Sequence, residues 1–163
     1  MKLYFLRHAT ASDIAACDEE RALTREGREE ARIAGTALAK LGAKPGQILT
    51  SPLVRARQTA ELAAAELKFS DEVAVFDELC NGRSTAVLLR VLKQFEGARE
   101  LLLVGHMPSL ADHLAQLIGA ANPAGLALGK GSIACIELAD LRAAQGELRW
   151  FLRQKQLRLL AGS

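Results

Sequence analysis

The sequence predicts an α/β fold in which helices cover both faces of a central, mostly parallel sheet. Short apolar segments alternate along the chain with longer segments whose apolar residues recur at helical spacing. The segment Leu101–Val104 is apolar throughout, which is typical of a strand that is covered on both sides. We find no repeat, low-complexity tract or linker, so we expect a single domain over residues 1–163.

The first half of the chain opens with a strand and a helix. Lys2–Leu6 is rich in apolar and aromatic residues and predicts a buried strand. The following helix is expected to begin near Thr24, whose hydroxyl can cap it, and to run through EEARIAGTALAKL. Gly42 should end this helix, because glycine tolerates the left-handed conformation found there. A second short strand is expected at Gln47–Thr50.

The second helix is predicted to open at Ser51 and Pro52. A hydroxyl that caps the helix, followed by a proline in the first turn, is a common helix start. This helix would carry Arg55 and Arg57 and continue to Leu67.

The second half repeats the alternation. Val73–Phe76 is expected to be a strand, and Ser84 to cap the helix TAVLLRVLKQF. After the central strand Leu101–Val104, Pro108 should open a helix that ends near Gly119.

Two late strands are expected at Ser132–Leu138 and Glu147–Leu152, joined through DLRAAQG. Within this connection, Asp140–Ala144 could instead form a helical turn. The C-terminal QKQLRLL carries a few positive charges, and we interpret it as an exposed end.

Composition argues against several functional classes. The formal net charge is only +2 and aromatic residues make up 4%, which disfavours nucleic-acid binding. No segment is long and apolar enough to span a bilayer, and the N-terminal LYFL is interrupted too early for a signal peptide. The three cysteines, Cys17, Cys80 and Cys135, are widely spaced and are expected to be reduced thiols. We therefore expect a cytoplasmic protein that binds neither membrane nor nucleic acid.

Three predicted strands are each followed by residues suited to phosphoryl chemistry. In open α/β sheets, ligands bind beyond the carboxyl ends of the strands, so these residues should share one edge. In chain order they are Arg7, His8, Ala9, Thr50, Ser51, Arg55, Gly105 and His106. The sequence therefore predicts a pocket that contains two imidazoles and two guanidinium groups.

These side chains fit phosphoryl transfer. A neutral imidazole is a good nucleophile near pH 7, and arginine offers a planar fork that matches two phosphate oxygens. Ala9 and Gly105 are small and should let the backbone approach a ligand. The helix that starts at Pro108 would add partial positive charge.

The segments YFLRHATA, SPLVRARQTA and LLLVGHMPSLAD resemble the three signatures of the histidine phosphatase superfamily. The chain length and DEERALTREGREEA are similar to its small SixA-type phosphohistidine phosphatases. The resemblance runs from Lys2 to the strand around Ile133. It implies a phosphoglycerate mutase-like three-layer sandwich and a reaction that needs neither metal nor cofactor.

The resemblance also implies roles for individual residues. His8 would be phosphorylated transiently, Arg7 and Arg55 would clamp the phosphoryl oxygens, and His106 would stabilise the transferring group. Ala9 would line the substrate site, and Arg21 would supply a further basic contact to the substrate.

The chain departs from the family pattern at several positions. Ala9 stands where many relatives have glycine, Met107 where asparagine is frequent, and Ala22 where proline is common. Larger relatives supply a carboxylate that protonates the leaving group, but Asp77 and Glu78 cannot be aligned with it. If both are structural, phosphohistidine is favoured over phosphate esters, because imidazole is the better leaving group.

Other polar residues are expected to lie outside the site. His113 is predicted to be a partly exposed helix residue, and Arg57 a solvated charge on a different helix face from Arg55. The acidic stretch of Asp13, Asp18, Glu19 and Glu20 is expected to be a solvated loop.

The function predicted from the sequence is hydrolysis of phosphohistidine on a protein partner, with a phosphate-bearing substrate as the minimum requirement. A broad small-molecule phosphomonoesterase and a non-catalytic phosphate-binding module remain alternatives. A metal site of His8, His106 and His113 ranks last, because arginines would repel a cation and the usual ligand spacings are missing. The sequence leaves the oligomeric state open.

Overall fold

The computed structural model describes residues 1–141 and 145–162, and its centre is a six-stranded sheet in the order β3-β2-β4-β1-β5-β6. The strands are β1 (Lys2–Arg7), β2 (Gln47–Thr50), β3 (Ala74–Val75), β4 (Glu100–Gly105), β5 (Ile133–Asp140) and β6 (Gln145–Leu152). β1 to β4 run parallel, whereas β5 pairs antiparallel with both β1 and β6. The predicted mostly parallel α/β sheet is therefore confirmed.

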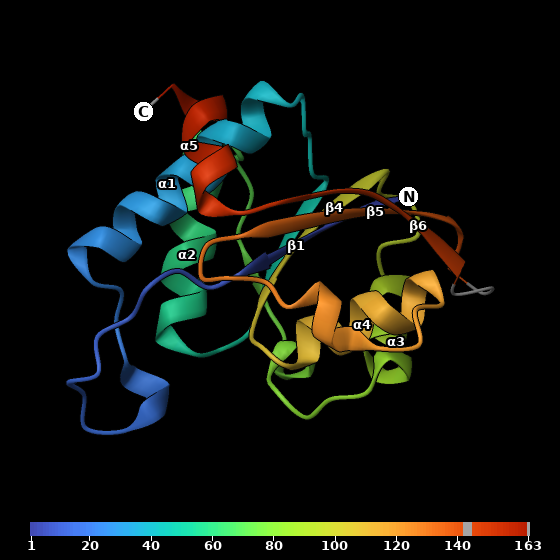
Figure 1. The fold of residues 1–163 in the computed structure, drawn as a ribbon, viewed down its shortest axis with the longest axis horizontal. Helices are drawn as coiled ribbons and strands as arrows, with labels where there is room; N and C mark the ends of the chain where they lie inside the picture. Colours follow the sequence, from blue (N-terminus) through green and yellow to red (C-terminus); the bar gives the residue numbers. More distant parts are fainter. Residues whose placement is uncertain (142–144, 163) are drawn as a thin grey trace.

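Helices cover both faces of this sheet (Figure 1). The helices are α1 (Arg25–Lys40), α2 (Val54–Glu66), α3 (Thr85–Lys93), α4 (Ser109–Ile118) and α5 (Gln154–Ala161). Three short 3-10 turns complete the described elements: η1 (Asp18–Glu20), η2 (Asp77–Leu79) and η3 (Pro123–Leu126). α1, α2 and α5 lie on one side, and α3 and α4 on the other.

The central strand β4 shows why both faces are covered. Leu101 and Leu103 pack into the core shared with α3 and α4, whereas Leu102 and Val104 pack into the core shared with α1 and α2. All four side chains are fully buried. Successive side chains of a strand point to opposite faces, so an uninterrupted apolar strand requires a helix layer on each side.

Most helix ends follow the predicted capping. The Thr24 hydroxyl accepts a hydrogen bond from the Gly27 N–H at 3.0 Å, and Ser84 caps α3 in the same way. Gly42 and Gly119 have φ of 78° and 70°, the left-handed conformation expected of a residue that ends a helix.

The start of α2 differs from the prediction. The helix begins at Val54, and its capping position is Leu53, whose side chain makes no cap hydrogen bond. Ser51, the expected cap, is fully buried and uses its hydroxyl elsewhere. A tertiary contact therefore overrides the local capping rule at this position.

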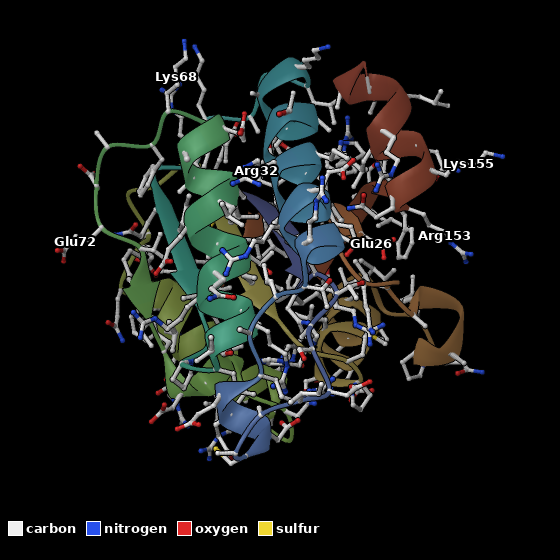
Figure 2. All side chains as sticks on the ribbon, turned by 90° about the vertical axis from the view of Figure 1, so that its left-hand side faces the viewer. Glu26, Arg32, Lys68, Glu72, Arg153 and Lys155 are labelled. Carbon is white, nitrogen blue, oxygen red and sulfur yellow. The ribbon has the colours of Figure 1, made fainter. Side chains whose placement is uncertain are left out.

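The C-terminal segment is a helix that the sequence interpretation missed. α5 lies beside α1, as Figure 2 shows from the side of α1 and α2, and Leu157 of α5 is fully buried. Lys155 on the same helix points away from the protein (Figure 2). The helix is short, and its single buried leucine is too weak a periodic signal to predict it.

Two other predictions concern the late strands and membrane association. Residues 142–144 of the predicted helical turn lie outside the described residues, and Asp140 itself ends β5. No helix within the described part of the chain is long and apolar enough to cross a membrane.

The N-terminal end of α1 packs closely against the loop that follows β1. A Cβ at Gly27 would lie 1.9 Å from the backbone oxygen of Thr10, far inside van der Waals contact. The same Thr10 oxygen accepts a hydrogen bond from the Thr24 N–H at 3.0 Å. Any side chain at position 27 must therefore separate α1 from this loop.

We expect Gly27→Ala to lower the free energy of unfolding by about 1–3 kcal/mol or more, because overpacking forces backbone shifts. Denaturant unfolding monitored by circular dichroism measures this. Gly97→Ala is the matched control: a Cβ at Gly97 would have no heavy atom within 4 Å, and its effect should stay within roughly 0.5 kcal/mol. Equal stability of the two variants would contradict the close approach of α1 to Thr10.

Candidate active site

The site forms where three neighbouring strands end. β4 lies between β1 and β2, with Arg7 opposite Gly105 and Thr50 opposite Val104. Backbone hydrogen bonds continue this pairing past the strands: His8 N–H donates to the Gly105 oxygen at 3.0 Å, and Ser51 N–H donates to the Val104 oxygen at 3.2 Å. The residues that follow β1, β2 and β4 are thereby brought together.

The two histidine rings face one another across this edge. Their centroids are 5.0 Å apart, and the side chains are nearly buried, with His8 9% and His106 2% exposed. His8 Nδ1 lies 2.8 Å from the backbone oxygen of Ala9. A carbonyl can only accept, so in neutral His8 the proton sits on Nδ1 and the lone pair is on Nε2. Nε2 is thus the ring nitrogen of His8 whose lone pair is available to a ligand.

Further contacts hold the backbone beyond His8. Ala9 N–H donates to the Thr59 hydroxyl at 3.1 Å, and that hydroxyl donates to the Arg55 backbone oxygen at 2.7 Å. Thr10 N–H donates to the buried carboxylate of Glu30 at 2.8 Å. Both backbone groups of Ala9 are therefore used within the protein. The structure gives Ala9 a part in orienting His8, and a substrate contact at Ala9 stays a prediction.

The arginines each keep one buried donor free. Arg7 donates through Nη1 to the Leu128 oxygen at 2.8 Å, and Arg55 donates through Nη1 and Nη2 to the backbone oxygen and carboxylate of Asp18, at 2.6 and 2.8 Å. The Nε atoms of Arg7 and Arg55 are buried and have no hydrogen-bond partner among the described residues. These two Nε atoms are buried donors that remain available to a ligand.

Asp18 corrects the expectation of a merely solvated acidic loop. Its carboxylate forms an ion pair with Arg55, and hydrogen bonds from Arg55 and then Arg21 lower the pKa of Asp18 below its usual value. Its side chain is 60% exposed, so it shields the arginine from the solvent side. Hydrophobic periodicity does not indicate which loop residue contacts a distant helix. The contact between Asp18 and Arg55 of α2 could therefore not be predicted from the sequence.

Arg21 contacts the loop before α1 and none of the site histidines. Its guanidinium binds Asp13, Asp18 and the backbone oxygen of Ser12. Arg21 therefore stabilises the conformation of the loop that carries Asp18. Direct contact between Arg21 and a substrate stays a prediction.

His106 is held by a residue for which the sequence predicts another role. The Ser51 hydroxyl and His106 Nε2 are 2.6 Å apart, and Ser51 is fully buried. The other ring nitrogen, Nδ1, is buried and has no hydrogen-bond partner among the described residues. The sequence groups Ser51 with the residues at this edge of the sheet, but its predicted use as a helix cap left the contact with His106 unpredicted.

Gly105 is closely packed within the protein. A Cβ at Gly105 would lie 3.2 Å from the Leu79 oxygen and 3.1 Å from a Leu110 methyl group, so η2 and α4 both approach it. Its part in letting the backbone approach a ligand stays a prediction.

Burial keeps both site histidines neutral. Desolvation, with smaller contributions from Arg55 and Arg7, lowers the pKa of His8 to about 4. Desolvation first, and then the neighbouring His8 and Arg55, lower the pKa of His106 to about 3. The exposed Lys130 acts on His8 in the same direction, a contribution that the sequence does not single out. At neutral pH the positive charge of the site resides on arginine.

The structure does not bring every candidate into the site. His113 was expected to be partly exposed, but it is 1% exposed, and its Nδ1 lies 2.9 Å from the Thr85 hydroxyl of α3. The prediction was wrong because α3 covers that face of α4. Arg57 forms an exposed ion pair with Glu61 at 3.8 Å, as expected of a solvated charge.

The carboxylates considered as acids lie in η2. Asp77 is exposed and Glu78 is half-buried, and within the described residues neither makes a hydrogen bond or ion pair to the histidines or arginines of the site. No three His, Cys, Asp or Glu side chains of the described segments gather as a ligand set for a metal ion.

The chain is similar to known phosphatases. Residues 3–81, which contain Arg7, His8 and Arg55, match the family model of the histidine phosphatase superfamily (branch 1). An uncharacterised protein of Picosynechococcus sp. is 44% identical over 117 residues, covering 69% of this chain and 70% of that protein. The chain belongs to the histidine phosphatase superfamily.

Within this superfamily, the SixA-type members are similar over most of the chain. Phosphohistidine phosphatase SixA of Escherichia coli is 28% identical over 125 residues, covering 76% of this chain and 78% of that protein. A structure of the protein histidine phosphatase SixA in complex with tungstate superposes with a TM-score of 0.88 at 26% identity, covering 96% of this chain and 99% of that one. This histidine phosphatase is a SixA-type enzyme.

We expect the stability of this histidine phosphatase to fall as the pH drops from about 6.5 towards 4. Burial lowers the pKa of His8 and His113 to about 4 and that of His106 to about 3, so in this window the unfolded chain binds protons that the folded protein does not. The free energy of unfolding should fall by up to about 1.4 kcal/mol per pH unit for each histidine. Denaturant unfolding at a series of pH values measures the slope.

His113→Gln, which can still hydrogen-bond to Thr85, should reduce this slope by about one third, because one of three similar contributions is removed. Asp18 contributes little above about pH 5: its pKa is lowered, so its stabilising effect is lost only as the pH falls below that value. A flat profile between pH 6.5 and 5 would contradict the buried, neutral state of the histidines.

Proposed function

We propose that this protein hydrolyses phosphohistidine on a protein partner through a phosphorylated His8. The observation that carries the proposal is the set of buried, unpaired nitrogen atoms on Arg7, Arg55 and His106, three residues that are close enough to His8 to contact its ring or to lower its pKa. Buried polar groups are almost always hydrogen-bonded, so such a cluster indicates a ligand that completes it. Donors from three directions, two of them cationic, suit a tetrahedral oxyanion.

The first step transfers the phosphoryl group to His8. The lone pair of His8 Nε2 forms a bond to phosphorus while the bond from phosphorus to the substrate imidazole nitrogen breaks. The hydrogen bond from Nδ1 to the Ala9 oxygen stabilises the positive charge that develops on the His8 ring. Arg7 and Arg55 would donate to the equatorial phosphoryl oxygens, where charge is greatest.

The second step releases phosphate. Water attacks the same phosphorus, the bond to His8 Nε2 breaks, and the electron pair returns to the neutral imidazole. The water oxygen and the phosphoryl group leave as inorganic phosphate, which shares the remaining proton with solvent. The low pKa of His8, about 4, makes this imidazole a good leaving group and a nucleophile that is ready at neutral pH.

The leaving group distinguishes phosphohistidine from a phosphate ester. An alkoxide needs a proton from an acid placed next to the departing oxygen. The substrate imidazole can take up a proton from solvent at its other ring nitrogen and depart neutral. An enzyme whose η2 carboxylates make no contact with the site residues is therefore better suited to phosphohistidine.

The comparisons support the same substrate. The E. coli relative is named a phosphohistidine phosphatase, and a similar SixA structure was solved with tungstate, a tetrahedral oxyanion. In our proposal the reaction needs no metal and takes place in the cytoplasm, as the sequence and its family resemblance imply.

We expect radioactive phosphate from a ³²P-phosphohistidine carrier protein to be trapped on wild-type protein as an acid-labile, base-stable adduct, and not on His8→Ala. Arg55→Ala should lower kcat/KM by about 10²–10³-fold, because it removes a cationic donor to the transition state. Arg57→Ala, an exposed arginine on the same helix, is the matched control and should leave kcat/KM unchanged. Full turnover by His8→Ala would overturn the mechanism.

We expect Glu78→Gln and Asp77→Asn to leave dephosphorylation of the carrier protein unchanged, because the departing imidazole needs no acid from η2. Parallel assays with the carrier and an aryl phosphate measure this. A fall of about 10²–10⁴-fold in ester turnover alone would identify an acid for esters and favour a broader phosphatase. Loss of activity on both substrates would contradict the account of the leaving group.

A further inference from the structure

The contact between Ser51 and His106 carries an inference that deepens the proposed function and rests on it. Ser51 follows β2 directly, and its backbone N–H binds the Val104 oxygen, which places it beside Gly105 and within reach of His106. The Ser51 hydroxyl and His106 Nε2 are 2.6 Å apart, and both residues are buried. A short contact between buried groups defines the orientation of both.

The hydroxyl has one acceptor within reach. Among the described residues, Ser51 Oγ makes no hydrogen bond other than the one to His106. If His106 Nε2 carried the ring proton, it would donate to Ser51, and the hydroxyl hydrogen of Ser51 would remain buried without an acceptor. If Nε2 carries the lone pair, the hydroxyl donates to it and both groups are satisfied.

The other ring nitrogen of His106 remains available to a ligand. His106 Nδ1 is buried and unpaired within the described residues, and the ring lies 5.0 Å from the His8 ring, centroid to centroid. Burial and His8 lower the pKa of His106 to about 3, so the ring is neutral near pH 7 and has a single N–H. A lone pair on Nδ1 would repel the phosphoryl oxygens, whereas an N–H there would donate to them.

We infer that Ser51 is a positioning residue that holds neutral His106 in the Nδ1–H tautomer and thereby makes it a hydrogen-bond donor to the phosphoryl group. The hydroxyl of Ser51 acts through the imidazole and does not touch the substrate. The residues near the phosphoryl group then offer hydrogen-bond donors from Arg7, Arg55 and His106 and a single lone pair, that of the nucleophile on His8.

The tautomer is measured directly by ¹⁵N NMR of histidine-labelled full-length protein, which has only three histidines. His113→Gln and His8→Gln identify their own signals, and His106 is assigned as the remainder. We expect His106 Nδ1 to be protonated and Nε2 to be unprotonated in the wild type. A protonated Nε2 in the wild type would overturn the inference, and this measurement does not depend on activity.

Addition of tungstate tests which nitrogen faces the anion. We expect the Nδ1 proton of His106 to shift on titration while the Nε2 signal, which reports the contact to Ser51, changes little. A shift confined to Nε2 or to His113, or no shift at either His106 nitrogen, would overturn the assignment of Nδ1 to the phosphoryl group.

Ser51→Ala and Ser51→Thr form a matched pair, since only threonine keeps the hydroxyl. We expect Ser51→Ala to lose the preference for the Nδ1–H tautomer and to lower kcat by about 10–100-fold with little change in KM, in the range seen when a residue that orients a catalytic group is removed. Ser51→Thr should retain the tautomer and most of kcat. Circular dichroism and denaturant unfolding of both variants check that they fold.

The outcomes separate this inference from the proposed function. An unchanged tautomer and unchanged kcat in Ser51→Ala would overturn the role of Ser51, even if phosphate is trapped on His8. His106 could be in the Nδ1–H tautomer, with an Nδ1 proton signal that shifts with tungstate, while no phosphate is trapped on His8. That result would overturn the proposed reaction and leave the positioning of His106 by Ser51 standing.

Discussion

The site depends on the parallel pairing of β1 and β2 with the two sides of β4. This pairing sets Arg7 beside Gly105 and Thr50 beside Val104, so three distant segments leave the sheet at the same level. A slip of one residue would turn every side chain of a strand to the other face. In β4 such a slip would exchange the side chains that face the two cores, and in one direction it would move the half-buried Glu100 into the fully buried position of Leu101. Packing of the two cores therefore helps to determine where the residues of the candidate site lie.

The same constraint explains how much the sequence could predict. Strand ends can be located from short apolar segments, and the predicted bounds of β2, Gln47–Thr50, agree with the observed strand residue for residue. The residues after these strands can therefore be grouped from the sequence alone. Contacts that depend on loops could not be predicted: Asp18 reaches Arg55 from a segment without periodicity, and Ser51 had an equally good local use as a helix cap. α5 was missed because its stability comes from packing against α1 and not from its own pattern.

Among the described residues, three of the five buried side-chain atoms without a hydrogen-bond partner belong to the candidate site. Unpaired donors of Arg7, Arg55 and His106 are buried together, and two neutral imidazoles lie in contact. Each such group destabilises the fold, because it has given up water without gaining a partner. The supporting contacts are correspondingly rigid: Glu30 and Thr59 hold the backbone after His8, and Leu128 holds Arg7. Donors that are already oriented need no reorganisation when charge develops on a bound group.

The carboxylate of Asp18 changes what the pocket offers to an anion. It forms an ion pair with one of the two guanidinium groups, and each terminal nitrogen of Arg55 donates one hydrogen bond to Asp18. Free inorganic phosphate therefore meets a weaker electrostatic field than the two arginines alone would produce.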